Sequence, residues 1–301
     1  MLAALLLTVE ASRGDHPSAA AAADGVPRMA SQNPACTPVV RPAPSRRTPP
    51  ATGSQPHLVT ILADDLGFDD LRSHDIGPNL TTFAPTVATL LKEGVVLDRH
   101  HSYKWCSPTR RSFLTGRFPV SLTGKQAATD SNLTPLQFTL LSEKLEAAGY
   151  ESHFVGKGHL GWQTTDHLLV NRGFSSHAGY LGGGEAYKWG GGSEDPTSGA
   201  HDFWHNEAPG VELVPQIYYS TNFYSEYAVA RIMERNRSRP FWLHVAYQAV
   251  HSGEFREDAP PEDDLPPGTG FRDQGYGNAL VSLDHGVKNI TKALRDEGMW
   301  G

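Results

Sequence analysis

The sequence predicts an α/β fold in which a mostly parallel central sheet is flanked by helices. Two short, mostly apolar runs, 57–63 and 240–246, have the length and composition of buried strands, and the first of them is rich in β-branched residues. Segments with apolar residues at helical spacing alternate with such runs, and residues 220–236 lead directly into the strand-like run at 240–246. Alternating helices and strands build parallel sheets whose faces are covered by helices.

The first 54 residues differ in composition from the rest of the chain. They contain 12 Ala and 8 Pro and no aromatic residue, so they bury too little apolar surface to offset the entropy lost on ordering. Residues 1–9 are similar to the apolar part of a signal peptide. We therefore assign residues 1–54 to a leader and a disordered Ala/Pro-rich linker, and residues 55–301 to one globular domain.

Four Asn-x-Ser/Thr triplets, at Asn79, Asn132, Asn236 and Asn289, fit export through a glycosylating compartment. Together with the apolar start, they predict a glycoprotein of the secretory pathway, secreted from the cell or lysosomal.

The remaining elements follow in order along the globular domain. Proline at a first-turn position begins one helix, and glycine ends two of them. The predicted helices are 85–93, 136–148, 220–236 and 278–296, and the predicted strands are 57–63, 150–155 and 240–246.

Two stretches lack periodicity and are expected to decorate the surface: the Gly-rich and aromatic-rich residues 173–210 and the Pro-rich residues 260–270. The final predicted helix, 278–296, stands where an α/β fold normally continues into another strand. We therefore expect a fold that is incomplete at its C-terminus.

Charge and composition exclude several classes of protein. The net charge is −7, and no block of Lys and Arg is present that would follow a phosphate backbone, so nucleic acid is not an expected partner. No run of about 18 apolar residues occurs, which excludes a membrane span of the helical kind. The two cysteines, Cys36 and Cys106, cannot form a disulfide framework.

An acidic pair, Asp64 and Asp65, follows the predicted strand at 57–63. Ligands of open α/β sheets bind at the carboxyl ends of the strands. Two adjacent carboxylates at such a place repel each other unless a cation lies between them, and Ca²⁺ or Mg²⁺ is the usual partner of carboxylate oxygens. The alternative is a turn with two solvated acids.

Cys106 begins a small helix-like segment that includes Arg110. A nucleophile at this position would face the positive end of a helix. A cysteine phosphatase is excluded, because its arginine would fall on Ser112. A buried structural cysteine remains the alternative.

Basic side chains follow two other strands. Lys157 and His159 lie in a Gly-flanked turn just after the strand at 150–155, and His251 lies just past the strand at 240–246. Fixed cations at a strand end suit an anionic ligand. A basic turn and a structural histidine are the alternatives.

Taken together, these motifs resemble the sulfatases, and most closely the arylsulfatase B-like branch of the alkaline phosphatase-like superfamily. The resemblance covers about residues 56–301. It is carried by the segment 56–68 around the acidic pair, by Cys106-Ser-Pro-Thr-Arg110, by the segment 149–159, by Tyr219-Ser-Thr-Asn222 and by Gln248-Ala-Val-His251, in the order of the family. It implies an alkaline phosphatase-like sandwich with a mostly parallel central sheet.

The resemblance also implies a mechanism of sulfate ester hydrolysis, on a sulfated small molecule or glycan. In the family a formylglycine-generating enzyme converts the cysteine to formylglycine, whose hydrate is the nucleophile, and a divalent ion, usually calcium, binds beside it. Transferred residue by residue, Asp64, Asp65 and Cys106 would hold the ion, and Arg110 would orient the hydrate. Lys157 and His251 would bind the sulfate and assist the leaving oxygen, and His159 would accept a proton from the hydrate.

The sequence departs from the family in two respects. It has no Asp-Asn dipeptide, which supplies two further metal ligands in the family, and it has the less usual Trp105 just before the cysteine. An arylsulfatase-type sulfuric ester hydrolase is the leading hypothesis, and a catalytically inactive secreted fragment that binds sulfated glycans is the alternative. A phosphatase or phosphodiesterase of the same superfamily would have Ser or Thr in place of Cys106.

Overall fold

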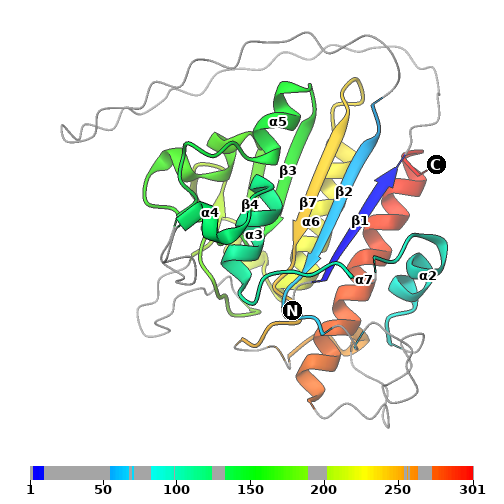
Figure 1. Ribbon diagram of the computed structural model, residues 1–301. Coiled ribbons are helices and arrows are strands. Elements are labelled where there is room, and N and C mark those ends of the chain that lie inside the picture. Colours follow the sequence, from blue (N-terminus) through cyan, green and yellow to red (C-terminus); the bar gives the residue numbers. More distant parts are fainter. Residues whose placement is uncertain are drawn as a thin grey trace.

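The computed structural model describes residues 3–9, 55–67, 70, 83–97, 99–123, 133–188, 202–253, 256, 258–263 and 273–300. Its centre is a sheet of seven strands in the order β1-β2-β7-β3-β4-β5-β6 (Figure 1). The four middle strands, β2, β7, β3 and β4, are parallel to one another. The predicted α/β fold with a mostly parallel sheet is therefore confirmed.

The predicted strands form with ends that shift by at most one residue. They are β2 (His57–Ala63), β3 (Glu151–Gly156) and β7 (Phe241–Ala246). Strand β7 is buried along its whole length and pairs with β2 on one side and β3 on the other. Continuous burial explains why its sequence is apolar throughout.

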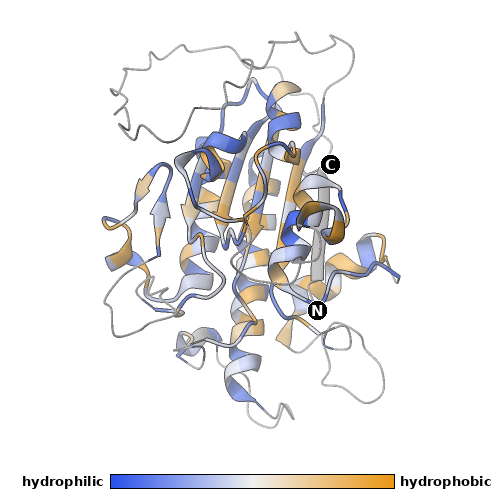
Figure 2. Cartoon of the chain, turned by 60° about the vertical axis from the view of Figure 1, so that its left-hand side comes forward, coloured by the Kyte–Doolittle hydropathy of each residue, from blue (hydrophilic) through white to orange (hydrophobic). Residues whose placement is uncertain are grey.

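Helices cover both faces of the sheet (Figure 1). Helices α3 (Cys106–Thr115) and α5 (Leu141–Ala147) lie on one face, whereas α6 (Ser220–Glu234) and α7 (Gln274–Asp296) lie on the other. Helix α2 (Pro85–Glu93) packs against α7, and the short α4 (Pro119–Thr123) follows α3. The helices in Figure 2 carry both hydrophobic and hydrophilic bands, as expected when one side packs inward and the other faces solvent.

Two predicted helices begin elsewhere than the pattern suggested. Helix α5 starts five residues later than predicted, because the Glu143 carboxylate accepts the N–H of Leu140 (2.7 Å) and fixes the N-terminal turn there. Helix α7 starts four residues earlier, where the Asp273 side chain accepts the N–H of Tyr276 (3.1 Å).

Helix α2 obtains its N-terminal cap from another helix. The Asp284 carboxylate on α7 accepts the backbone N–H groups of Val87 (2.8 Å) and Thr86 (3.2 Å). Burial raises the pKa of Asp284, and the accepted hydrogen bonds oppose that rise. The contact fixes α2 on α7 at one side of the sheet.

The expectation that residues 173–210 decorate the surface is wrong for much of this stretch. Strand β4 (Ser176–Gly179) pairs with β3, and Tyr180, Tyr187 and Phe203 are buried in the core. The stretch also forms the short antiparallel strands β5 (Trp204–His205) and β6 (Ala208–Pro209). These elements were missed because strands of two to four residues are too short to show periodicity.

Strand β1 (Ala3–Val9) lies at the edge of the sheet and pairs antiparallel with β2. These residues fall within the segment that the sequence analysis assigns to a leader, and that assignment stays a prediction. The rest of the segment assigned to the leader and linker, residues 10–54, lies outside the described residues. Short 3₁₀ turns complete the described elements, at Thr165–His167, Leu169–Arg172, Val214–Gln216 and Pro261–Asp263. No helix in the described ranges is both long enough and apolar enough to cross a bilayer.

Candidate active site

The acidic pair lies at the carboxyl end of β2, and its two side chains have different surroundings. Asp64 is fully buried, and its backbone is held by hydrogen bonds from its N–H to Ala249 O (2.9 Å) and from Val250 N–H to its carbonyl (2.8 Å). Asp65 has a positive φ of 55°, and its side chain is 55 % exposed. The left-handed residue turns the chain, so one carboxylate is buried and the other faces solvent.

Two cations surround the buried carboxylate. Lys157 Nζ lies 2.5 Å from Asp64 Oδ2, and Arg110 Nη2 lies 3.4 Å from the same oxygen. Arg110 also donates to the carbonyl of Lys157 (2.8 Å). Burial by itself would raise the pKa of Asp64, but Arg110 and Lys157 outweigh it and hold that pKa below its ordinary value. The three buried charges therefore form one compensated cluster.

Lys157 reaches this position because β3 ends in a glycine. Gly156 has φ of 100°, and a Cβ there would lie 2.2 Å from the carbonyl oxygen of Ala246 on β7. Only glycine allows the two strands to approach so closely at their carboxyl ends. The next residue, Lys157, is thereby directed into the site.

Cys106 is the first residue of α3, and its sulfur lies 3.2 Å from Nδ1 of His159. Burial, together with the nearby charges of Lys157 and Arg110, lowers the pKa of His159 to about 3. The imidazole is therefore neutral near pH 7 and able to accept a proton from a group at position 106. Gly116, in the left-handed conformation, ends the helix.

His251 lies in the loop after β7, on the open side of the site. Its Nδ1 is 2.5 Å from the carbonyl of Ser252, so that nitrogen carries the proton, because a carbonyl can only accept. Its Nε2 lies 3.5 Å from Asp65 Oδ2. The hydroxyl of Tyr187 donates to the His251 carbonyl (2.8 Å) and so stabilises the loop.

The structure thus brings together all seven residues that the sequence analysis singled out. They form three contacting groups at the carboxyl ends of β2, β3 and β7: Asp64 with Arg110 and Lys157, Cys106 with His159, and Asp65 with His251. Cys106 and Arg110 are one helical turn apart on α3, and Lys157 precedes His159 by two residues, so the first two groups adjoin each other.

Sequence reasoning missed one acidic residue near the site. Glu185 is fully buried; it accepts a hydrogen bond from Tyr224 (2.7 Å), and its carbonyl accepts one from the side chain of Gln248. Burial raises the pKa of Glu185 to about 8. The signal that could have located it is the run Gly182-Gly183-Gly184 before it, since a Cβ at Gly183 would lie 2.7 Å from the His159 ring.

The donor set at the acidic pair fits a hard divalent cation. Asp64 Oδ1 is buried and accepts no hydrogen bond from the described residues, so one carboxylate oxygen is available for coordination. Asp65 offers a second carboxylate beside it. Among the described residues no group of three or more His, Cys, Asp or Glu side chains is arranged to hold a metal.

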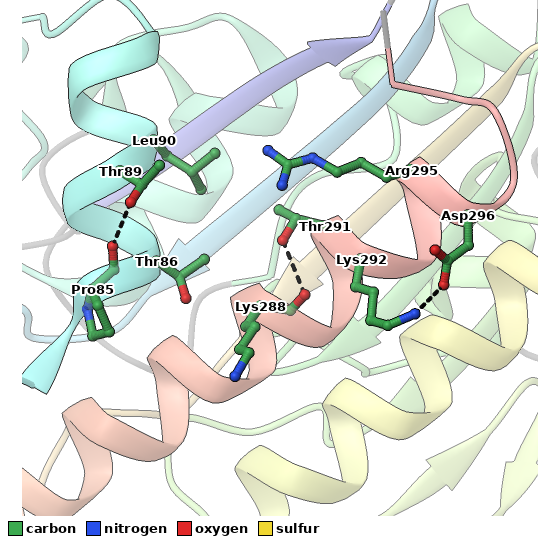
Figure 3. A pocket seen from close by; sticks show the side chains of 9 residues that line it. All are labelled: Pro85, Thr86, Thr89, Leu90, Lys288, Thr291, Lys292, Arg295 and Asp296. Atoms are coloured by element: carbon green, nitrogen blue, oxygen red, sulfur yellow. Dashed lines mark hydrogen bonds and ion pairs between the residues drawn. The ribbon is translucent and has the colours of Figure 1, made fainter.

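Two hollows lie away from this cluster. The one in Figure 3, of about 510 Å³, lies between α2 and α7, and two of the three cations that line it are paired: Lys292 with Asp296, and Arg295 with Glu93 (3.7 Å). Its hydroxyls bond within their own helices, Thr89 to Pro85 O and Thr291 to Lys288 O. A second hollow, of about 450 Å³, runs along α3 between Tyr103 and Phe118.

Comparison with known proteins identifies the family of the chain. The Sulfatase family model matches residues 56–301. The chain is 33 % identical to arylsulfatase J of Mus musculus over 256 residues. This match covers 82 % of this chain and 41 % of the relative. It is 27 % identical to N-acetylgalactosamine-6-sulfatase of Homo sapiens, over 80 % of this chain and 47 % of that protein. The chain thus spans less than half the length of these relatives.

Solved structures show the same fold. The crystal structure of Ps i-CgsB in complex with k-i-k-neocarrahexaose superposes with a TM-score of 0.63 at 24 % identity, covering 80 % of this chain and 55 % of that one. PsFucS1 sulfatase from Pseudoalteromonas sp. gives a TM-score of 0.56 at 18 % identity, covering 80 % and 52 %. The predicted alkaline phosphatase-like α/β fold is confirmed, and the chain belongs to the sulfatase family.

Proposed function

We propose that this chain contains the nucleophile and the anion-binding half of a sulfuric ester hydrolase that acts on a sulfated sugar. The observation that carries the proposal is the contact between Cys106 and His159 (3.2 Å) beside the cations Arg110 and Lys157. A nucleophile, a proton acceptor and two fixed cations at one sheet edge suit attack on an anionic ester. The sugar is inferred from relatives such as N-acetylgalactosamine-6-sulfatase.

The fixed cations bind the sulfate. Lys157 and Arg110 are held by Asp64 and by each other, so they need no rearrangement when the anion arrives. Lys157 would bind the sulfate, and Arg110 would orient the group at position 106. The negative charge of a bound sulfate ester offsets the cations that lower the pKa of His159, so substrate binding makes this imidazole a better proton acceptor.

His251 is placed to assist the leaving oxygen. Its Nδ1 proton is engaged by Ser252 O, which leaves Nε2 directed at the open side next to Asp65. His251 would therefore bind the ester and donate a proton to the departing sugar oxygen.

A modified residue 106 and a metal ion would complete the proposed site. Formylglycine at position 106, made from Cys106 by the formylglycine-generating enzyme, would provide the nucleophilic oxygen. Asp64, Asp65 and residue 106 would hold Ca²⁺, or Mg²⁺, which supplies Lewis-acid activation when bound. Maturation by that enzyme implies the secretory pathway and an extracellular or lysosomal destination. Of the two glycosylation triplets within the described residues, Asn236 is exposed in the turn before β7, and Asn289 is exposed on helix α7.

A second candidate is a secreted protein that binds sulfated glycans without turnover. One observation favours it. In the described ranges the candidate metal donors are only two carboxylates and residue 106, whereas two cations that could bind an anion, Arg110 and Lys157, lie side by side. Such a chain would retain affinity for sulfate esters with an unmodified thiol at Cys106.

Peptide mass spectrometry of the secreted protein tests the proposal. Trypsin releases residues 105–110, and conversion of Cys106 to formylglycine lowers the mass of this peptide by about 18 Da. We expect the modified peptide together with release of sulfate from a sulfated sugar. An unmodified thiol in every preparation, with intact binding of sulfated sugars, would instead establish the second candidate.

A further inference from the structure

Two tryptophans flank the contact between Cys106 and His159. Trp105 directly precedes Cys106, and Trp162 follows His159 by three residues. Trp105 is 48 % exposed and Trp162 is 50 % exposed, whereas Trp242 in the core is 1 % exposed. Large exposed aromatic side chains beside a polar site are typical of binding surfaces.

Trp105 has a fixed backbone, and the cation of Lys104 lies next to its ring. Its carbonyl accepts hydrogen bonds from Oγ1 (2.8 Å) and N (3.3 Å) of Thr109, so its backbone is fixed at the start of α3. The ammonium of Lys104 lies 4.8 Å from the centre of its ring. The ring and the ammonium together form a surface that is apolar in one part and positive in another.

Trp162 is held by the turn that follows His159. Gly161 has φ of 93°, and a Cβ there would lie 2.4 Å from the Cα of Leu133. The Leu160 carbonyl accepts the N–H of Thr134 (2.7 Å). Three residues span at most about 11 Å, so Trp162 lies close to the Cys106–His159 contact.

We propose that Trp105, Lys104 and Trp162 form a rim subsite that binds the sugar rings next to the sulfate ester of a sulfated oligosaccharide. The proposal rests on the proposed function and names the class of substrate that the site selects. The apolar face of a sugar ring stacks on an indole, and the Lys104 ammonium pairs with a second sulfate group along the chain. In a protein with a net charge of −7, a cation at this position favours a polyanionic ligand.

Calorimetric titration of the full chain tests this subsite. The probes are a hexasaccharide that carries N-acetylgalactosamine 6-sulfate, the desulfated hexasaccharide and inorganic sulfate. We expect Trp105→Ala and Trp162→Ala each to weaken binding of the sulfated hexasaccharide about threefold to tenfold, with the affinity for inorganic sulfate unchanged. Lys104→Gln should weaken it more at low salt than at high salt. Trp105→Phe and Trp162→Phe keep an aromatic face and should restore most of the affinity.

Phe118→Ala is the matched control, because Phe118 is 80 % exposed and lies beyond the other end of α3. Equal affinity of the native chain and both Trp→Ala variants for the hexasaccharide would overturn the subsite. A loss in Phe118→Ala as large as in Trp105→Ala would also overturn it, by locating the sugar in the hollow along α3. Absence of hexasaccharide binding by the native chain overturns it as well. Failure of the proposed hydrolysis is seen separately, as an unmodified Cys106 and no sulfate release while the tryptophan-dependent binding persists.

Discussion

The two halves of the site differ in how their charges are held. In the buried half, Asp64, Lys157 and Arg110 are at most 2 % exposed and contact one another. In the open half, the Asp65 side chain is 55 % exposed and His251 is 28 % exposed. Buried charges must be compensated within the protein, whereas exposed charges are solvated by water. The buried half is therefore tied to the stability of the fold, and the open half is free to respond to ligands.

Removing the charge of Asp64 should give the largest effect. Asp64→Asn leaves Lys157 and Arg110 as buried cations without their carboxylate, so we expect a loss of about 3–5 kcal/mol in the free energy of unfolding. Urea denaturation measures it. Asp65→Asn is the matched control and should change stability by no more than about 0.5 kcal/mol. Similar losses in the two variants would remove the distinction between the halves.

The second largest effect is expected in the pH dependence of the free energy of unfolding. The pKa of Glu185 is raised from 4.5 to about 8, so its contribution is lost as pH rises through 8. The pKa values of His177 and His244 are lowered from 6.5 to about 3 by burial, so their contribution is present above pH 6.5 and lost as pH falls toward 3. We expect a stability maximum near pH 6.5.

Glu185→Gln isolates the alkaline side of that maximum. Glu185 alone should reduce stability by about 1.4 kcal/mol per pH unit above pH 6.5, and the variant should remove this slope up to pH 8. Urea denaturation at pH 6.5, 7.25 and 8 provides the measurement. An unchanged slope in the variant would show that Glu185 is ionised in the folded protein.

The open half should determine the affinity for the metal. Because Asp65 offers an exposed carboxylate next to Asp64, Asp65→Asn should weaken Ca²⁺ binding by about tenfold without a change in stability of the metal-free protein. Calorimetric titration of the chelator-treated protein gives the affinity. Asp70→Asn, at another acid of the same segment, is the control, and a loss of affinity confined to that variant would contradict the assignment.

The smallest effect is expected from removing the hydrogen bond that Tyr187 donates to the His251 backbone. Tyr187→Phe removes the hydrogen bond to the His251 carbonyl (2.8 Å) and should reduce stability by about 0.5–1.5 kcal/mol. Tyr219→Phe is a close comparison, because Tyr219 stacks on Tyr187 and donates to the Arg256 carbonyl (2.9 Å). If only Tyr187→Phe also raises hydrogen exchange at His251, the contact holds this part of the loop in place.

The sequence alone predicted the residues of the site better than the region that supports it. Asp64, Lys157 and His251 follow long apolar strands, and the carboxyl ends of parallel strands meet at one edge, so their convergence followed from order along the chain. Strand β4 and the buried Glu185 could not be predicted, because a four-residue strand has no periodicity and a glutamate is buried only where its tertiary partners allow it.

Strand β1 has a consequence for processing. It pairs with the outer side of β2 from Ala3 to Val9, and so it satisfies backbone donors and acceptors that would otherwise meet solvent. If a peptidase removes these residues as a leader, β2 loses its antiparallel partner on this side, and its outer backbone groups become able to pair with another strand.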